Sequence, residues 1–130
     1  MKSRARTGSG KQGFFDAKRA FKKTTEYGAA ETIVAQGEDC SDIHYVESGL
    51  VKLALVSKRG KGAVLGILGQ GDFFGEACIG GDTVYSTSAI ALVPTCISVM
   101  PGRAMLRTLK EDSAFAMQFM NYLLTRNRRI

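Results

Sequence analysis

The sequence has few of the residues that metal enzymes need. Its 130 residues include one histidine, His44, and no tryptophan. Single-metal hydrolases and oxygenases of the cupin type usually use two or three imidazoles, so a histidine-rich metal enzyme is excluded. His44 stands in the strand-like run Ile43 to Val46, where we expect a half-buried structural residue.

Cysteine is also scarce. Cys40, Cys78 and Cys96 are widely spaced and form no CxxC pair. A four-cysteine zinc or iron–sulfur site is therefore not expected. The spacing predicts three buried, reduced thiols. A redox role for Cys78, which follows Glu76 by two residues, is the alternative.

Long apolar runs are absent. No stretch approaches the roughly 18–20 residues that span a bilayer, and no apolar segment follows the basic start as in a signal peptide. We therefore expect a cytoplasmic protein without a membrane partner. A chain of 130 residues with 45% hydrophobic residues suits one core. The prediction is a basic flexible tail over 1–13 and one domain over 14–130.

The net charge of +6 lies at the two ends. Lys2, Arg4, Arg6 and Lys11 precede residue 14, and Arg126, Arg128 and Arg129 follow residue 125. The body between them is close to neutral, and no basic stripe with interleaved aromatics runs through it. Short basic ends are usually solvated rather than bound to nucleic acid. Since the body also lacks a basic surface pattern, the chain is not expected to read DNA.

Glycines punctuate the middle of the chain at a nearly constant interval. Gly37, Gly49, Gly60 and Gly71 are 12, 11 and 11 residues apart, with short apolar runs between them. This pattern predicts short antiparallel strands. We expect a mainly β fold with flanking helices: an antiparallel double-stranded β-helix (jelly roll) over about 26–100.

Helical patterns flank the strands. A short helix is predicted over 16–23, a second over 102–110, and a longer one from Asp112 or Ser113, either a plausible N-cap. The longer helix carries a broad apolar face that a second copy of the chain could cover. We therefore predict a homodimer through this helix, with a dimerisation face formed by Phe115, Phe119, Tyr122 and Leu123.

The stretch GDFFGEA at 71–77 is the most informative local motif. Gly75 followed by Glu76 and Ala77 predicts a tight turn that opens a short helix, with backbone N–H groups and one acid facing a pocket. Such a site could hold a phosphate and a sugar hydroxyl. Yet no Lys, Arg or His occurs from Gly62 through Gly102.

The ordered set of motifs resembles the cyclic-nucleotide-binding domain of the Crp/Fnr transcription regulators, from residue 14 to 130. The matching stretches are QGE at 36–38, YVESGLVK at 45–52, GK at 60–61, GDFFGEA at 71–77, AIAL at 89–92 and LLTRNR at 123–128.

The resemblance implies a phosphate-binding cassette that begins at Gly75. There, Glu76 would hold a ribose hydroxyl, and N–H groups near Glu76 and Ala77 would meet the phosphate. The arginine that clamps the phosphate in relatives falls on Tyr85 or Ser86, which carry no positive charge. Its loss removes roughly 1.5–3 kcal/mol, or roughly 10- to 150-fold in affinity. The hydroxyls of Tyr85, Ser86 and Thr87 could still donate hydrogen bonds.

Three function classes follow. The first is the effector-sensing and dimerising domain of a Crp/Fnr-type bacterial regulator. It would bind a cyclic nucleotide or another small anionic effector, although tight binding of cyclic AMP is not expected. The second is a ligand-free scaffold or interaction module, in which Glu76 only stabilises its own turn. The third, a metal-dependent cupin enzyme, is disfavoured by the single histidine. DNA would be read only by a helix-turn-helix that this chain does not contain.

Overall fold

The computed structural model describes residues 23–129, and their side chains as far as Arg126. The predicted basic tail and the predicted short helix, except Lys23, lie outside this range. Lys23 begins the first strand. Within the described residues, no helix is both long and apolar enough to cross a bilayer.

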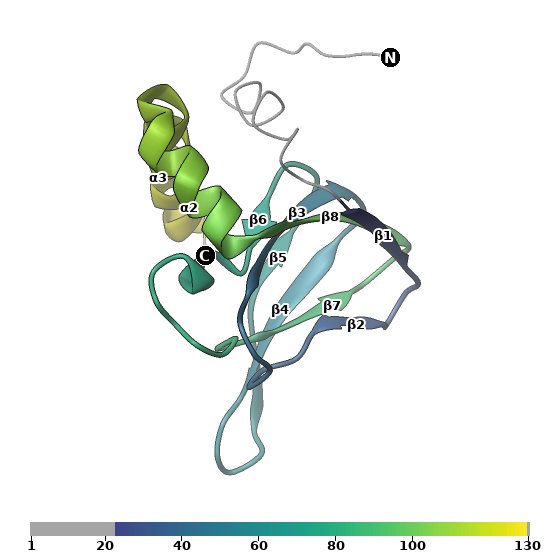
Figure 1. Cartoon of the computed structure of the whole chain (residues 1–130). Helices are drawn as coiled ribbons and strands as arrows, with labels where there is room; N and C mark the ends of the chain where they lie inside the picture. Colours follow the sequence, from purple (N-terminus) through teal and green to yellow (C-terminus); the bar gives the residue numbers. More distant parts are fainter. Residues whose placement is uncertain (1–22, 130) are drawn as a thin grey trace.

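Two four-stranded antiparallel sheets face each other to form the roll (Figure 1). The first sheet has the order β1 (Lys23–Tyr27), β8 (Thr95–Pro101), β3 (Asp42–Ser48) and β6 (Phe73–Phe74). The second has the order β2 (Thr32–Val34), β7 (Ser88–Ala91), β4 (Val51–Val56) and β5 (Gly62–Leu68). The predicted mainly β roll with flanking helices is confirmed.

The regularly spaced glycines lie in the turns, as the sequence predicts. Gly37, Gly49, Gly60 and Gly71 have φ angles of 91°, 104°, 81° and 90°, a left-handed region that residues with a Cβ enter at a cost. Gly49 is also enclosed, because a Cβ there would lie 2.3 Å from Thr95 Oγ1. Gly60 has open space around it.

Strand β3 is buried on both faces. Because side chains alternate along a strand, Val46 packs between the sheets while Ile43 and Tyr45 face the helices. The inter-sheet core also contains Val34, Val51, Leu53, Leu68, Phe74, Tyr85, Ala89 and Ile97. The helix-facing core is completed by Phe73, Met100, Met105, Phe115 and Phe119.

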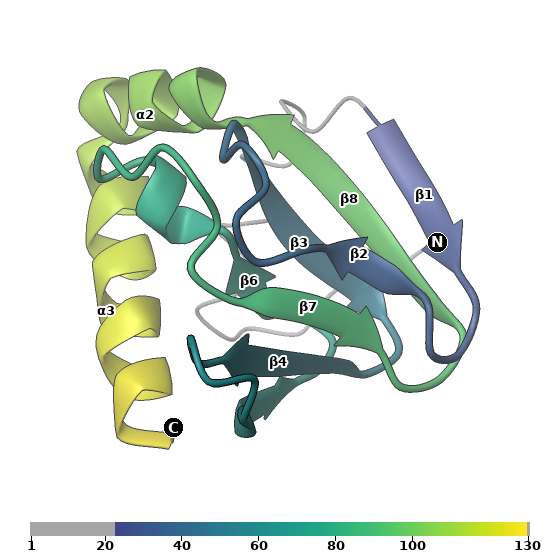
Figure 2. The ribbon, with the colours of Figure 1, turned by 90° about the horizontal axis from the view of Figure 1, so that it is seen from below.

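Two helices, α2 (Gly102–Glu111) and α3 (Ser113–Arg129), cover the outer face of the first sheet. Asp112 caps α3: its Oδ1 accepts a hydrogen bond from the Phe115 N–H at 3.0 Å. Farther along α3, the Tyr122 hydroxyl accepts a 2.6 Å hydrogen bond from the Phe73 N–H. Figure 2 shows α3 running past the short helical segment that follows β6.

The predicted dimerisation residues lie against the protomer's own core. Phe115 and Phe119 are buried within it, and Tyr122 and Leu123 pack against it. As far as Arg126, the large apolar side chains that α3 exposes are Met117, Met120 and Leu124. A role for α3 in dimerisation stays a prediction.

Gly49→Ala is expected to lower the free energy of unfolding by about 3 kcal/mol, from the left-handed φ and the contact with Thr95 together. Gly60→Ala, the matched control, carries only the backbone cost of about 1 kcal/mol. Urea unfolding of the two variants measures the difference. If both variants lost the same free energy of unfolding, Thr95 would have moved to make room for the added methyl group.

Candidate functional site

The site begins at Gly75, between β6 and the one-turn 3₁₀ helix η3 (Glu76–Cys78). Gly75 has a φ of 84°, and a Cβ there would lie 2.9 Å from the Asp42 carbonyl oxygen. Glycine is therefore required by both conformation and space. The N–H groups at the start of a helical turn have no partner within the helix, so those of Glu76 and Ala77 are suited to an anion.

Glu76 forms an ion pair with Arg126 of α3. Arg126 Nη2 lies 2.9 Å from Glu76 Oε2, and Nη1 lies 3.2 Å from Oε1, which makes the pair bidentate. The Arg126 side chain is 11% exposed and that of Glu76 is 26% exposed. Arg126 also donates a hydrogen bond to the Phe73 carbonyl oxygen.

Arg126 remains protonated in this setting. Burial acts to lower the pKa of its guanidinium, but the negative charge of Glu76 and hydrogen bonds to Tyr122 and Glu76 outweigh burial. The pKa of Arg126 therefore lies above its ordinary value. The ion pair connects the cassette to α3.

Sequence reasoning missed Arg126, which it placed in a solvated basic end. The signal that could have found it is helical spacing. Arg126 follows Tyr122 by four residues and Phe119 by seven, so all three share the face that packs on the roll. A cation thus reaches the cassette from another element, although none occurs from Gly62 through Gly102.

All six predicted cassette residues line one small cavity of about 50 Å³, together with Arg126. They are Gly75, Glu76, Ala77, Tyr85, Ser86 and Thr87. Ser86 and Thr87 lie at its mouth and also line the next cavity. Tyr85 is buried, and its hydroxyl donates a 3.1 Å hydrogen bond to the Asp42 carbonyl oxygen.

A larger cavity of about 470 Å³ adjoins the small one. The two share Leu53, Glu76, Ser86, Thr87 and Arg126. Leu65 of β5 and Leu123 and Leu124 of α3 give the larger cavity an apolar wall. Only the larger cavity falls within the several hundred Å³ typical of ligand sites. The small cavity, which contains the Glu76–Arg126 ion pair, is called the chamber below, and the larger one the vestibule.

His44 lies beneath the cassette in β3, as a strand residue. It is more buried than predicted, at 5% exposed. Its ring stacks on Phe74 with centroids 4.8 Å apart, and its Nδ1 has no hydrogen-bond partner. Burial lowers the pKa of His44 from 6.5 to about 4. His44 is therefore neutral at pH 7.

The prediction of three reduced thiols is wrong. Cys40 and Cys78 form a disulfide with Cα atoms 5.4 Å apart, and Cys96 is not part of it. The sequence spacing of the cysteines did not reveal the disulfide, because backbone pairing between distant segments brings the two residues together. The Cys40 N–H donates to the Thr83 carbonyl at 2.9 Å, which brings the segment before β3 alongside the segment after η3.

Comparisons with known proteins agree on one family. The cyclic nucleotide-binding domain matches residues 24–112. The cAMP-activated global transcriptional regulator CRP of Haemophilus influenzae is 40% identical over 52 residues, which are 40% of this chain and 23% of that protein.

Solved structures share the fold. The Thermus thermophilus catabolite activator protein has a TM-score of 0.76 at 24% identity, over 88% of this chain and 54% of that one. The sensor domain of the transcriptional regulator DNR from Pseudomonas aeruginosa has a TM-score of 0.69 at 24% identity, over 82% of this chain and 72% of that one. The chain thus spans about half the length of the first structure and matches less than a quarter of the curated relative.

His44 makes stability depend on pH. Its folded pKa of about 4 lies below the ordinary 6.5, so between these values the unfolded chain binds the extra proton. The stability contributed by neutral His44 is present above pH 6.5 and is lost as the pH falls towards 4. Wild type should lose about 3 kcal/mol more than His44→Phe over this window in urea unfolding. If the two proteins lost the same free energy of unfolding between pH 6.5 and 4, the lowered pKa of His44 would be contradicted.

Proposed function

Because this chain belongs to the cyclic nucleotide-binding domain family and is of the Crp/Fnr type, we propose that it senses a small anionic effector for a transcription regulator. The observation that carries the proposal is the Gly75 turn with the Glu76–Arg126 ion pair, placed where the chamber adjoins the apolar wall of the vestibule.

The anionic group of the effector would lie at the start of η3. There the N–H groups of Glu76 and Ala77 would donate to it, with Ser86 and Thr87 at the chamber mouth. An ionised carboxylate has about four acceptor positions, so Glu76 can accept from an effector hydroxyl while it stays paired with Arg126. A phosphorylated sugar supplies both groups.

The charge balance argues against tight binding of cyclic AMP. Arg126 is the cation in the chamber, but its charge is offset by Glu76 at 2.9 Å. The effector's negative charge would therefore be met mainly by backbone N–H groups and hydroxyls. Hydroxyls fix geometry without neutralising charge, so we infer weaker binding than a dedicated phosphate-binding arginine would provide.

The apolar vestibule would receive the rest of the effector. Leu65 comes from β5, whereas Leu123 and Leu124 come from α3, so an occupant would contact the roll and the helix together. A ligand shifts a conformational equilibrium only through such differential contacts. We infer that effector binding is transmitted through the position of α3.

The second candidate is a scaffold that uses no effector. Glu76 and Arg126 already satisfy each other, and the chamber of about 50 Å³ is too small for a nucleotide without movement of a lining side chain. In this alternative the ion pair only holds α3 on the roll. The binding experiment below separates the two candidates.

To regulate transcription, this domain would have to act together with a DNA-binding element. We propose that the regulator supplies such an element in addition to the domain described here. The proposed setting is the cytoplasm, where DNA and nucleotide effectors are found together.

We also propose that α3 forms a homodimer contact. Met117, Met120 and Leu124 are 56%, 53% and 58% exposed and are spaced i, i+3 and i+7, which places them on one stripe. A second copy of the same helix would cover this stripe while the opposite face of α3 stays packed on the roll.

Sedimentation equilibrium tests the dimer. Met120→Glu should weaken association by roughly 30-fold or more, because a charge would be buried at the centre of the stripe. Leu92→Glu, an exposed apolar position in the turn between β7 and β8, is the control and should leave association unchanged. Equal association of the parent and Met120→Glu would contradict the proposed surface.

Titration calorimetry with cyclic AMP, cyclic GMP and cyclic di-GMP tests the effector site. The parent should bind one of them at micromolar concentrations, and Glu76→Ala should abolish binding. Glu26→Ala, an exposed acid on β1, is the control. Ser86→Arg adds a cation at the chamber mouth and should raise affinity for cyclic AMP by roughly 10- to 150-fold.

Two outcomes would favour the scaffold. One is the absence of binding in both the parent and Ser86→Arg. The other is binding that appears only in Ser86→Arg, since the pocket would then lack function in the natural sequence.

A further inference from the structure

The disulfide joins the effector cassette to the segment that precedes β3. Cys78 is the last residue of η3, two residues after Glu76, and Cys40 lies 38 positions earlier in the chain. Cys40 also lines the chamber that contains Glu76 and Arg126. The bond is thus part of the wall of the proposed effector site.

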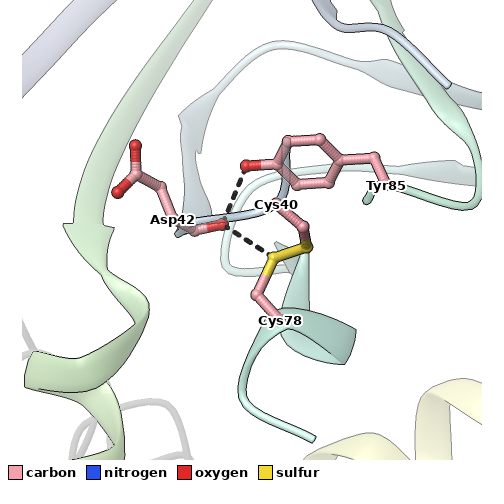
Figure 3. The surroundings of a disulfide bond; sticks show 4 residues. All are labelled: Cys40, Asp42, Cys78 and Tyr85. Carbon is pink, nitrogen blue, oxygen red and sulfur yellow. Dashed lines mark hydrogen bonds between the residues drawn. A yellow bond between two sulfur atoms is a disulfide. The ribbon is translucent and has the colours of Figure 1, made fainter. Parts of the chain in front are cut away.

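The segment around Cys40 is a fixed platform. Its backbone pairs with the strand-like stretch after η3: Cys40 N–H donates to the Thr83 carbonyl at 2.9 Å, and Tyr85 N–H donates to that of Glu38 at 2.9 Å. Figure 3 shows the Tyr85 hydroxyl directed at the Asp42 carbonyl, 3.1 Å away, beside the disulfide. These contacts do not involve sulfur, so the platform keeps them when the disulfide is reduced.

The turn of η3 is less well supported without the disulfide. Its own backbone hydrogen bonds are three i to i+3 contacts of 3.0–3.1 Å, from Cys78, Ile79 and Gly80. Such short 3₁₀ turns have poor hydrogen-bond geometry. The Asp82 N–H also donates to the Ala77 carbonyl at 3.1 Å. Among side chains, Arg126 holds that of Glu76 and Cys40 holds that of Cys78. Reduction removes the second of these two ties.

The reduced state also has a partner for its thiol. Cys78 Sγ lies 3.6 Å from the Asp42 carbonyl oxygen, the same atom that accepts from Tyr85. A disulfide sulfur has no hydrogen to donate, whereas a thiol at this position does. Both oxidation states of Cys78 are therefore accommodated without rebuilding the roll.

We propose that Cys40 and Cys78 are a reversible redox modification site that controls the order of the cassette. Both residues are half-buried rather than sealed in the core, so part of each is open to solvent. In the cytoplasmic setting proposed above, protein disulfides are typically transient or redox-sensing rather than permanent.

The oxidant is a low-molecular-weight disulfide. The Cys40 thiolate attacks one of its sulfurs, forming a mixed disulfide and releasing one small thiolate. The Cys78 thiolate then attacks the Cys40 sulfur, closing the protein disulfide and releasing the second small thiolate. Two electrons pass from the protein to the small disulfide, and the two protons lost by the cysteines protonate the released thiolates. A small dithiol reverses the reaction.

The consequence for the effector rests on the proposed function. With the disulfide closed, the N–H groups of Glu76 and Ala77 are held in place before binding, which lowers the cost of ordering them. Reduction would loosen the turn and weaken effector binding.

Hydrogen exchange of the ligand-free chain tests the redox site independently of any effector. The chain is equilibrated in buffers of reduced and oxidised glutathione, and its thiols are counted by alkylation. We expect the pair to open and close reversibly. Exchange of the hydrogen-bonded amides of Cys78, Ile79 and Gly80 should be about fivefold or more faster in the reduced form. Amides of β3 and β8 should be unchanged.

Variants complete the test. Cys40→Ser with Cys78→Ser should reproduce the reduced exchange pattern in either buffer, whereas Cys96→Ser should behave as the parent. The proposal is overturned if oxidised glutathione leaves the pair reduced, or if exchange at residues 78–80 is the same in both forms. It is also overturned if reduction removes protection from both sheets, since the disulfide would then be a general structural link. Failure to bind any cyclic nucleotide would count against the proposed function and would leave these outcomes unaffected.

Discussion

The burial of β3 on both faces is the constraint on which the rest of the domain depends. Val46 packs between the sheets, and Ile43 and Tyr45 support the helices, so the strand belongs to two cores. Its first residue, Asp42, presents a carbonyl that touches three parts of the cassette. Tyr85 donates to it, Cys78 Sγ lies 3.6 Å away, and Gly75 must lack a Cβ because of it. The cassette is therefore built directly on the strand that the core holds most firmly.

The local patterns of the chain were sufficient for the fold. Glycine at 37, 49, 60 and 71 predicted turns because only glycine enters the left-handed region at little cost, and all four adopt it. Asp112 was one of two predicted caps for α3 and is the one that accepts the Phe115 N–H. These features could be predicted from the sequence because each depends on residues only a few positions apart.

Only part of the site could be predicted from the sequence, because some of its contacts join residues that are far apart in the chain. The six cassette residues follow one another closely and line the cavity as a group. Arg126 is 50 positions from Glu76, and Cys40 is 38 positions from Cys78, so both contacts exist only once the roll has closed. The apolar face of α3 misled in the same way. Phe115 and Phe119 are spaced for a helix interface, but spacing does not say whether the partner is the protomer's own sheet or a second copy.

The two ties on η3 differ in what can break them. The Glu76–Arg126 pair is electrostatic and lines the chamber, so an anion or hydroxyl there can compete for either partner. The Cys40–Cys78 bond is covalent and yields only to electron transfer, which no change in effector concentration supplies. Both ties act on the same turn, but only the ion pair reaches α3. An effector can therefore act on the turn and the helix together, whereas reduction acts on the turn alone and changes how readily the effector is held. In the proposed function, α3 therefore carries the signal of effector binding. The Cys40–Cys78 disulfide in the chamber wall separately controls how strongly the site binds the effector.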